Sequence, residues 1–303
     1  MSRSVDANCP GKRRGSVIWG RSVDLHVHST ASDGLLSPEQ LAGLALDKDL
    51  AAIAIADHDT TSGVQNLSQL AGGAKNQLDT IVYGGVEIVP AVEINSDWEG
   101  CELHILGYFV PLGDCAFQDL LGTLRADRRR RANRMIAKLG QLGMPIDKGR
   151  VAELAKGESV GRPHIAAAMV EEGYVSTSKE AFAKYIGIGK AAYVERERLN
   201  PRDCVTAIRD SGGVASWAHP VTACADHLLG EFVECGLNAL EAYHPEHDRK
   251  TQDKYVELAK RHNLCVTAGS DYHGPSSGEG GDLGDCRMGY EIIAELRELS
   301  NLA

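Results

Sequence analysis

Short apolar runs alternate with segments of helical periodicity along most of the chain. Strand-length runs occur at residues 22–27, 51–56, 81–94 (in two pieces), 102–110, 212–218, 238–243 and 263–269. The run at 51–56 is apolar throughout, which is typical of a parallel strand covered on both faces. Segments of helical periodicity lie between several runs, at 37–49, 200–212 and 247–263. The alternation predicts βαβ units, and therefore an α/β fold on a parallel sheet that is either open or closed.

Two of the predicted helices carry clear start signals. At 37–49, Ser37 is placed to cap the helix, Pro38 follows at its first position, and Gln40 completes a capping box. At 200–212, Asn200 and Pro201 provide the same cap and first turn.

The stretch from 117 to 199 breaks the alternation because it shows almost only helical periods. An arginine-rich segment at 124–143 predicts one long helix that ends at Gly143 and Pro145, and shorter helices are expected at 161–173 and 178–187. We therefore expect a flexible leader at 1–21, an α/β domain formed by 22–116 and 200–303, and a helical insertion at 117–199.

Composition and charge limit the class of protein. The 303 residues are 43% hydrophobic and 24% charged, which allows a sizeable core and excludes a disordered chain. No apolar run approaches the roughly 18–20 residues that a membrane span requires. The formal net charge of −10 argues against a broad basic surface for long duplex DNA, but not against one local basic pocket.

The eight cysteines are scattered and form no C-x-x-C pair. The N-terminal residues lack the apolar segment of about 7–15 residues that a signal peptide needs. We therefore expect reduced thiols and a cytoplasmic location. The sequence also has no Walker-type phosphate loop, which disfavours a nucleoside triphosphatase of that kind.

Histidines and carboxylates fall at or near the ends of the predicted strands: His26, His28, Asp33, His58, Glu93, His104, His219, Asp271 and His273. In parallel α/β folds the carboxyl ends of the strands meet at the rim where active sites are built, so we expect these side chains to converge. Each alone is explained as well by a structural hydrogen bond or ion pair. Together they would be costly to bury without metal ions. A mixed imidazole and carboxylate set suits Zn²⁺, Mn²⁺ or Fe²⁺, and nine ligands suit three ions.

The same residues occur in ordered motifs. The segments DLHVHSTASDG, IADHD, ELHILGYF, AHP and GSDYHG, spread from Val23 to His273, resemble successive motifs of the polymerase and histidinol phosphatase (PHP) superfamily. The resemblance implies a distorted, seven-stranded (β/α) barrel with a trinuclear metal centre. It also implies phosphoesterase chemistry, by attack of a metal-bridging hydroxide on phosphorus.

The resemblance further implies how the ligands divide. The first metal would be held by His26, His28, Glu93 and Asp271. The second would be held by Asp33, His58 and His273, and the third by His104 and His219, with Glu93 bridging it to the first. Some members of the superfamily have His where this chain has Asp33, which would shift the affinity for the second ion. Asp24 and Asp57 lie beside ligands and suit the orienting of imidazoles.

Candidate substrate contacts lie mainly in the predicted insertion. Arg162 and His164 begin a helix, where cationic groups and free N–H groups favour phosphate. A structural pair between this Arg and a nearby Glu explains the residues equally well, but the G-R-P-H motif resembles that of stand-alone bacterial PHP phosphoesterases. The arginines at 128–131 cannot all face one way on a helix, and we expect Arg131 to be one of two that face the site or an acidic neighbour. His244 follows another strand and is a candidate phosphate contact or proton donor.

The resemblance implies a metal-dependent phosphatase of small phosphorylated metabolites, above all nucleotides. A nucleoside 3′,5′-bisphosphate or nucleoside monophosphate phosphatase is expected, with trimming of short RNA from its 5′ end as a related activity. A histidinol-phosphate phosphatase and a non-catalytic module that binds metal or nucleotide are the alternatives. The sequence predicts no oligomeric state.

Overall fold

The computed structural model describes residues 21–73, 79–99, 101–195, 199–223, 225–275, 277 and 280–300. The predicted leader lies outside these residues except for Arg21. The strands are β1 (Ser22–Val27), β2 (Leu50–Ile55), β3 (Ile81–Tyr83), β4 (Val86–Trp98), β5 (Cys101–Tyr108), β6 (Val214–Trp217), β7 (Ala239–Tyr243), β8 (Cys265–Ala268) and β9 (Met288–Gly289).

The helices fall into two sets. The first belongs to the strand–helix alternation and comprises α1 (Pro38–Asp47), α2 (Ser62–Leu70), α7 (Pro201–Asp210), α8 (Leu229–Glu234), α9 (Arg249–Arg261) and α10 (Glu291–Ser300), with the 3₁₀ turns η2 (Pro220–Thr222) and η3 (Asp226–Leu228). The second comprises α3 (Cys115–Gln141), α4 (Lys148–Ala155), α5 (Arg162–Glu171), α6 (Ser178–Ala181) and the π-helical turn η1 (Phe182–Ile186).

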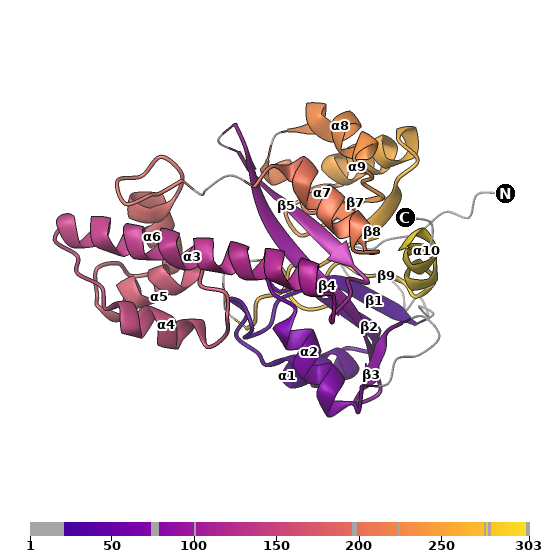
Figure 1. Ribbon diagram of the computed structural model, residues 1–303, viewed down its shortest axis with the longest axis horizontal. Coiled ribbons are helices and arrows are strands. Elements are labelled where there is room, and N and C mark those ends of the chain that lie inside the picture. The colour runs from indigo at the N-terminus through magenta and orange to yellow at the C-terminus, as the bar shows by residue number, and fades with distance from the viewer. Residues whose placement is uncertain are drawn as a thin grey trace.

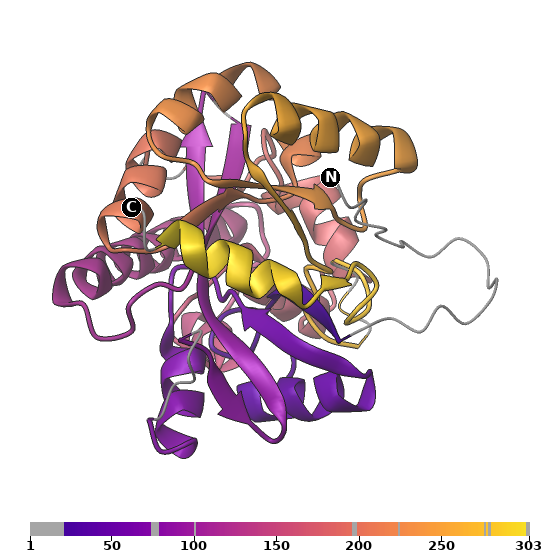
Figure 2. The same cartoon turned by 90° about the vertical axis from the view of Figure 1, so that its right-hand side faces the viewer.

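Seven of the strands form a nearly closed barrel (Figures 1 and 2), in the order β8-β7-β6-β5-β4-β2-β1. β9 pairs with the free edge of β1, and β3 pairs with β4. A bridge between Val27 and Tyr272, which follows β8, brings the two ends of the path together. The chain therefore has the expected seven-stranded α/β barrel with two short accessory strands.

The sheet is not wholly parallel, and on this point the sequence-based expectation is wrong. β5 is antiparallel to both of its neighbours, β4 and β6, whereas the other pairs in the seven-strand path are parallel. β4 and β5 form a hairpin that pairs from Ala91↔Tyr108 to Trp98↔Cys101. Because a hairpin needs no crossover helix, β5 enters the barrel at the rim where the parallel strands leave it.

Apolar residues close the other end of the barrel. Ile292, Ile293 and Leu296 of α10 belong to one core cluster with Val23 and Val214, which lie near the starts of β1 and β6. In Figure 2, α10 crosses this end of the barrel. The barrel is therefore packed with apolar side chains where the parallel strands begin, and polar side chains gather at the opposite rim.

The predicted helix starts are confirmed. Ser37 Oγ accepts a hydrogen bond from the Gln40 backbone N–H (3.3 Å), and Gln40 Oε1 accepts one from the Ser37 N–H (2.8 Å), which completes the capping box of α1. Asn200 Oδ1 caps α7 by accepting from the Arg202 N–H at 2.9 Å. Each cap satisfies a backbone N–H that has no partner within the helix.

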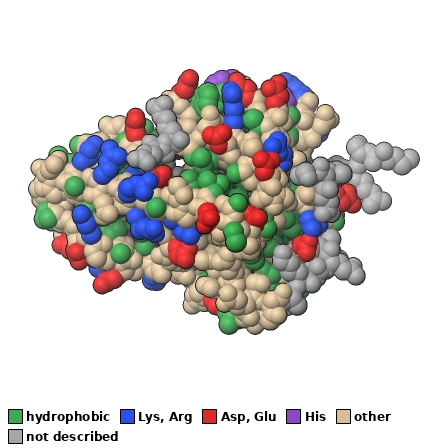
Figure 3. Space-filling view, viewed as in Figure 1, with side chains coloured by type: hydrophobic (Ala, Val, Ile, Leu, Met, Phe, Trp, Pro, Cys, Tyr) green, Lys and Arg blue, Asp and Glu red, His purple; other side chains and the backbone are tan. Residues whose placement is uncertain are grey.

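The helices α3 to α6 form a lobe beside the barrel (Figure 1). Their buried residues, from Ala132 to Val194, make a hydrophobic cluster of their own. α3 starts earlier than the sequence predicts, at Cys115, and ends at Gln141, two residues before Gly143 with its positive φ of 82°. Lys and Arg side chains gather over this end of the molecule (Figure 3). Arg129, Arg130, Arg134 and Lys138 of α3 are exposed.

Candidate metal centre

All nine side chains expected as metal ligands converge at the open rim of the barrel. Their ligand atoms fall into three groups, within each of which every atom lies within 4.8 Å of the others. The groups are His26, His28, Glu93 and Asp271; His28, Asp33, His58 and His273; and Glu93, His104 and His219. The division matches the one that the resemblance implies, except that His28 also joins the second group.

The first group is compact. His28 Nε2 lies 3.1 Å from His26 Nε2, 3.2 Å from Glu93 Oε2 and 3.1 Å from Asp271 Oδ1. His26 Nε2 lies 3.5 Å from the same oxygen of Glu93 and 3.3 Å from that of Asp271. Metal–ligand bonds of about 2.0–2.2 Å place neighbouring atoms of a tetrahedral site roughly 3.3–3.6 Å apart. These four atoms are therefore close to the spacing of ligands around one ion.

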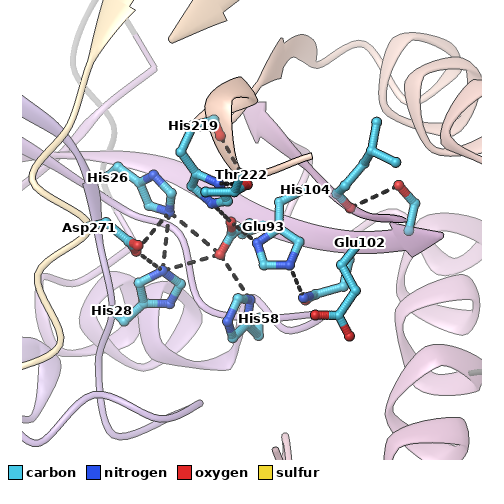
Figure 4. A network of polar contacts seen from close by, with 12 residues as sticks. His26, His28, His58, Glu93, Glu102, His104, His219, Thr222 and Asp271 are labelled. Carbon is cyan, nitrogen blue, oxygen red and sulfur yellow. Dashed lines mark hydrogen bonds and ion pairs between the residues drawn. The ribbon is translucent and has the colours of Figure 1, made fainter. Parts of the chain in front are cut away.

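Glu93 links the groups, as Figure 4 shows. Its Oε2 faces the first group and also lies 2.9 Å from His58 Nδ1. Its Oε1 lies 2.7 Å from His104 Nδ1 and 3.1 Å from His219 Nε2. The two oxygens of this buried carboxylate thus face different groups, as a bridging ligand requires.

The second group is wider. Asp33 lies 3.6 Å from the Nε2 atoms of both His58 and His273, and 3.8 Å from His28 Nδ1. Its loop directly follows β1, and the Asp33 side chain is almost fully buried.

The reversed direction of β5 explains the position of His104. The sequence-based expectation put the ligands near the carboxyl ends of parallel strands, but His104 is the fourth residue of β5. Because β5 runs against its neighbours, its first half lies at the rim that the others reach with their last residues.

The contacts of Asp24 and Asp57 go to backbone N–H groups and serines, not directly to imidazoles, which corrects the expected role. Asp24 accepts hydrogen bonds from the backbone N–H groups of His26, Ser270 and Gly284, and burial raises its pKa to about 6. Asp57 accepts from Ser29 and Ser32. The two carboxylates therefore fix the loops that carry the ligands, and Asp57 reaches a ring only through Ser32, whose Oγ lies 3.5 Å from His28 Nδ1.

Sequence reasoning missed Glu241, which does contact an imidazole. It is fully buried on β7, where Oε1 lies 3.1 Å from His26 Nδ1 and Oε2 accepts the backbone N–H of His219 at 2.8 Å. A proton on His26 Nδ1, donated to Glu241, leaves Nε2 free to bind a metal. The only local signal was a single acid in the otherwise apolar segment ALEAY.

The electrostatics favour ionised carboxylates but divide the imidazoles: against the effect of burial, neighbouring carboxylates raise the pKa of His26, His28 and His219. Burial opposes ionisation of Glu93, but His104, His58 and His26 hold the pKa of this carboxyl well below its usual range. Asp33 and Asp271 behave in the same way, because imidazoles outweigh burial. Burial lowers the pKa of His58 to about 4, despite Asp33 and Glu93. Metals bind ionised carboxylates and neutral imidazoles, so an ion that binds here would displace the protons of the three histidines whose pKa is raised.

Several buried ligand atoms lie close to one another without forming a hydrogen bond of normal geometry. They are Asp33 Oδ1, His58 Nδ1, Glu93 Oε2 and Asp271 Oδ1. Orphaned polar atoms in a native interior call for an explanation, and a bound ion is one. Their position at the centre of the groups shows that this donor set fits bound metal ions.

A cavity of about 610 Å³ opens beside the groups. Seven of the nine candidate ligands line it, together with His244 and residues of α3, α5 and η1. His244 Nε2 lies 3.5 Å from Asp271 Oδ2. The volume lies in the range of about 300–1,000 Å³ that is usual for small-molecule sites.

Of the arginines at 128–131, two are buried and line the cavity, Arg128 and Arg131, as their spacing on one helix face allows. Arg129 and Arg130 are exposed. Arg131 donates to the backbone oxygen of Val194 and pairs with Glu102 at 3.4 Å. Arg128, which the sequence did not single out, bonds to the side chains of Asp59 and Asn95.

Arg162 and His164, although adjacent on α5, have different surroundings. Arg162 lines the cavity and pairs with Glu102 at 2.6 Å. His164 is buried and is not among the described residues that line the cavity. Its Nδ1 accepts the Gly161 N–H at 2.9 Å, so it caps α5 instead of facing the substrate as expected.

Comparison with known proteins agrees with this geometry. A family model described as the PHP domain matches residues 24–197. The 5′-3′ exoribonuclease Rnm of Salmonella typhimurium is 32% identical over 258 residues, which cover 83% of this chain and 85% of that protein. The phosphoribosyl 1,2-cyclic phosphate 1,2-diphosphodiesterase of Eggerthella lenta is 33% identical over 254 residues, which cover 83% of this chain and 94% of that protein. The 3′,5′-nucleoside bisphosphate phosphatase of Chromobacterium violaceum is 31% identical over 270 residues, which cover 87% of this chain and 90% of that protein.

A solved structure from Bifidobacterium adolescentis, assigned as a metal-dependent phosphoesterase, superposes with a TM-score of 0.82 at 28% identity. The superposition covers 93% of this chain and 97% of the chain in that structure. The barrel, its rim and these matches define the chain as a metal-dependent phosphoesterase. It belongs to the PHP family. None of the described helices is long and apolar enough to cross a membrane.

Proposed function

We propose that this chain is a phosphatase of small phosphorylated nucleotides, chiefly nucleoside 3′,5′-bisphosphates or nucleoside monophosphates, and that it also trims short RNA from its 5′ end. One observation carries the proposal: members of all three candidate metal groups and three arginines line the same cavity. The relatives named as a bisphosphate phosphatase and an exoribonuclease support it. An enzyme is favoured over a non-catalytic module by the same names.

We propose that the nine residues hold three divalent ions of Mn²⁺, Fe²⁺ or Zn²⁺, divided as the three groups are. Such ions, when bound, lower the pKa of water and neutralise charge on the oxygens around phosphorus. Glu241 keeps the His26 ring turned toward the first group. The ordered loops that Asp24 and Asp57 tie down hold the remaining ligands in place.

Arg131 and Arg162 are proposed to bind phosphate. Guanidinium groups form paired, charge-assisted hydrogen bonds with phosphate oxygens. Both arginines pair with the carboxylate of Glu102 in the structure, so a doubly charged phosphate must compete with one carboxylate for them. His244, which faces the cavity, is proposed to contact the ester or donate a proton to its leaving oxygen.

We also propose that residues 117–199 are an insertion that forms part of the substrate pocket, with 22–116 and 200–303 as the barrel. The separate hydrophobic cluster at 132–194 supports this division, as do the cavity-lining residues of α3, α5 and η1. A cytoplasmic location is proposed as well, and the six described cysteines, all free thiols, are consistent with it. Cys9 and Cys224 lie outside the described residues.

A substrate panel tests the function. Turnover is measured on nucleoside 3′,5′-bisphosphates, nucleoside 5′-monophosphates, short 5′-phosphorylated RNA and histidinol phosphate, the alternative substrate. We expect the highest kcat/KM on a nucleotide, and loss of turnover in His28→Ala and His273→Ala. A preference for histidinol phosphate would overturn the nucleotide assignment. Full turnover in both variants would overturn metal catalysis at this site.

A further inference from the structure

Several residues of the cavity wall are apolar, and the function proposed so far gives their side chains no individual role. Met135 of α3, Val160, Ile165 of α5, Phe182 of η1 and Ile188 all line the cavity, and all belong to the lobe of helices α3 to α6. The candidate ligands, by contrast, come from the barrel and its loops. A substrate that fills the cavity therefore meets metal groups on one side and, on the lobe side, apolar side chains beside Arg131 and Arg162; Met135 and Ile165 are fully buried behind this surface.

Ile188 is exposed at the edge of this surface. The residue is 53% exposed, which is high for a large aliphatic residue, and it lies among the cavity-lining residues. Single exposed apolar side chains are common and need no explanation on an open surface. At the mouth of a cavity, an apolar side chain is available to a bound ligand.

The backbone around Ile188 is held firmly. The Gly187 N–H donates to the Phe182 backbone oxygen at 3.0 Å, and the Ala192 N–H donates to the Tyr185 oxygen at 2.9 Å. A Cβ on Gly187 would lie 2.5 Å from that Phe182 oxygen, so only glycine allows this close approach. The turn that follows the π-helix therefore holds Phe182 and Ile188 in a fixed arrangement. Single π-helical turns are frequent at functional sites.

Phe182 is paired with a cation. The Arg162 guanidinium lies 5.3 Å from the centre of its ring, and the same arginine pairs with Glu102. A phosphate-binding guanidinium is thus adjacent to an aromatic ring and aliphatic side chains. Nucleic-acid bases stack on aromatic rings and guanidinium planes, and the attached phosphates bind cations.

We propose that Phe182 and Ile188 form a nucleobase subsite: the base packs on these side chains while the reacting phosphate lies at the metal groups and Arg162 binds a second phosphate. The inference rests on the proposed nucleotide phosphatase function and makes it more specific. The base, and not only the phosphates, then contributes to substrate selection. A phosphorylated sugar without a base leaves this wall uncovered.

The test compares two substrates that differ only in the base: adenosine 3′,5′-bisphosphate and the 1-deoxyribose 3,5-bisphosphate that lacks it. Because stacking contributes about 1–3 kcal/mol per base, wild-type kcat/KM should favour the adenosine compound by about fivefold or more. In Phe182→Ala and Ile188→Ser this ratio should fall toward one, mainly through KM. Leu142→Ser is the control, because Leu142 is similarly exposed (46%) on the same lobe and does not line the cavity. It should leave the ratio unchanged.

The outcomes separate the subsite from the function. If the wild type hydrolyses both compounds equally, or both variants keep its ratio, the subsite is wrong and the phosphatase function stands. If the wild type hydrolyses neither of these compounds nor any nucleoside 5′-monophosphate, the proposed function fails and the subsite falls with it. Ile188 is a surface residue, so Ile188→Ser should fold even if Phe182→Ala does not. The ratio of the inhibition constants of adenosine 5′-monophosphate and ribose 5-phosphate measures the contribution of the base a second time, independently of turnover.

Discussion

Glu241 shows how one buried side chain can organise ligands from two metal groups. Its carboxylate contacts the His26 ring and the His219 backbone. In Glu241→Gln one of the two contacts is lost, because an amide cannot accept at both positions. Loss of such an orienting group typically weakens metal affinity about 10- to 100-fold. Competition with a chelator measures this affinity. Glu257→Gln, on the exposed surface of α9, is the control and should bind metal as the wild type does. A metal affinity of Glu241→Gln equal to that of the wild type would contradict the assigned role.

Arg162 provides the second residue-scale prediction. Its removal should raise KM for bisphosphates by about tenfold or more, since a hydrogen bond to a charged group contributes about 1.5–3 kcal/mol. The matched control is Arg150→Ala, because Arg150 lies on the same lobe but is exposed and paired with Glu153 and Glu171. Steady-state kinetics of both variants decides the matter. Unchanged KM in Arg162→Ala would leave this arginine with only its structural pair to Glu102.

At the scale of elements, the loop between α4 and α5 packs closely against the loop that carries Asp33. A Cβ on Gly157 would lie 2.3 Å from the backbone oxygen of Ala31, so the two backbones approach as closely as only glycine permits. Gly157→Ala must push these loops apart. We expect the free energy of unfolding to fall by about 1–3 kcal/mol, as for other overpacked sites.

Chemical denaturation of Gly157→Ala measures this change, and Gly140→Ala provides the control. Gly140 lies in α3, and a Cβ there would meet nothing within 4 Å. Alanine at that position should be neutral or stabilising by up to about 1 kcal/mol. Equal stability of the two variants would show that the loop contact is not tight.

The sequence predicted much of this architecture because the relevant signals are local. Capping residues marked the starts of α1 and α7, and the i, i+2 spacing of His26 and His28 placed both rings at one point. The direction of β5 could not be predicted in this way, because an apolar run reads the same in a parallel or an antiparallel strand. Glu241 was missed because its partner His26 is distant in the sequence, and no local pattern reports such a contact.

At the scale of the whole molecule, the net charge of −10 says little about the active site. Asp33, Glu93 and Asp271 are buried beside imidazoles, while Arg128, Arg131 and Arg162 line the same cavity. Ions bound at the rim would make the site locally cationic and suited to phosphate.

Metal binding to the folded chain should therefore stabilise the whole molecule. At a free concentration of about 100 times Kd, one ion adds about 2.7 kcal/mol to the free energy of unfolding. Metal-free protein should thus unfold at a lower temperature than protein with Mn²⁺, as calorimetry would show. Ca²⁺ at the same concentration should have a smaller effect, because it prefers all-oxygen ligands. An equal shift with both ions would indicate non-specific binding.

The metal content of the purified protein tests the central claim most directly. Elemental analysis, together with the protein concentration, gives the number of transition-metal ions per chain. Nine converging ligands in three groups predict about three ions, held by imidazole and carboxylate together. Fewer than two ions per chain, in protein that is folded and supplied with Mn²⁺, Fe²⁺ and Zn²⁺, would contradict a trinuclear centre.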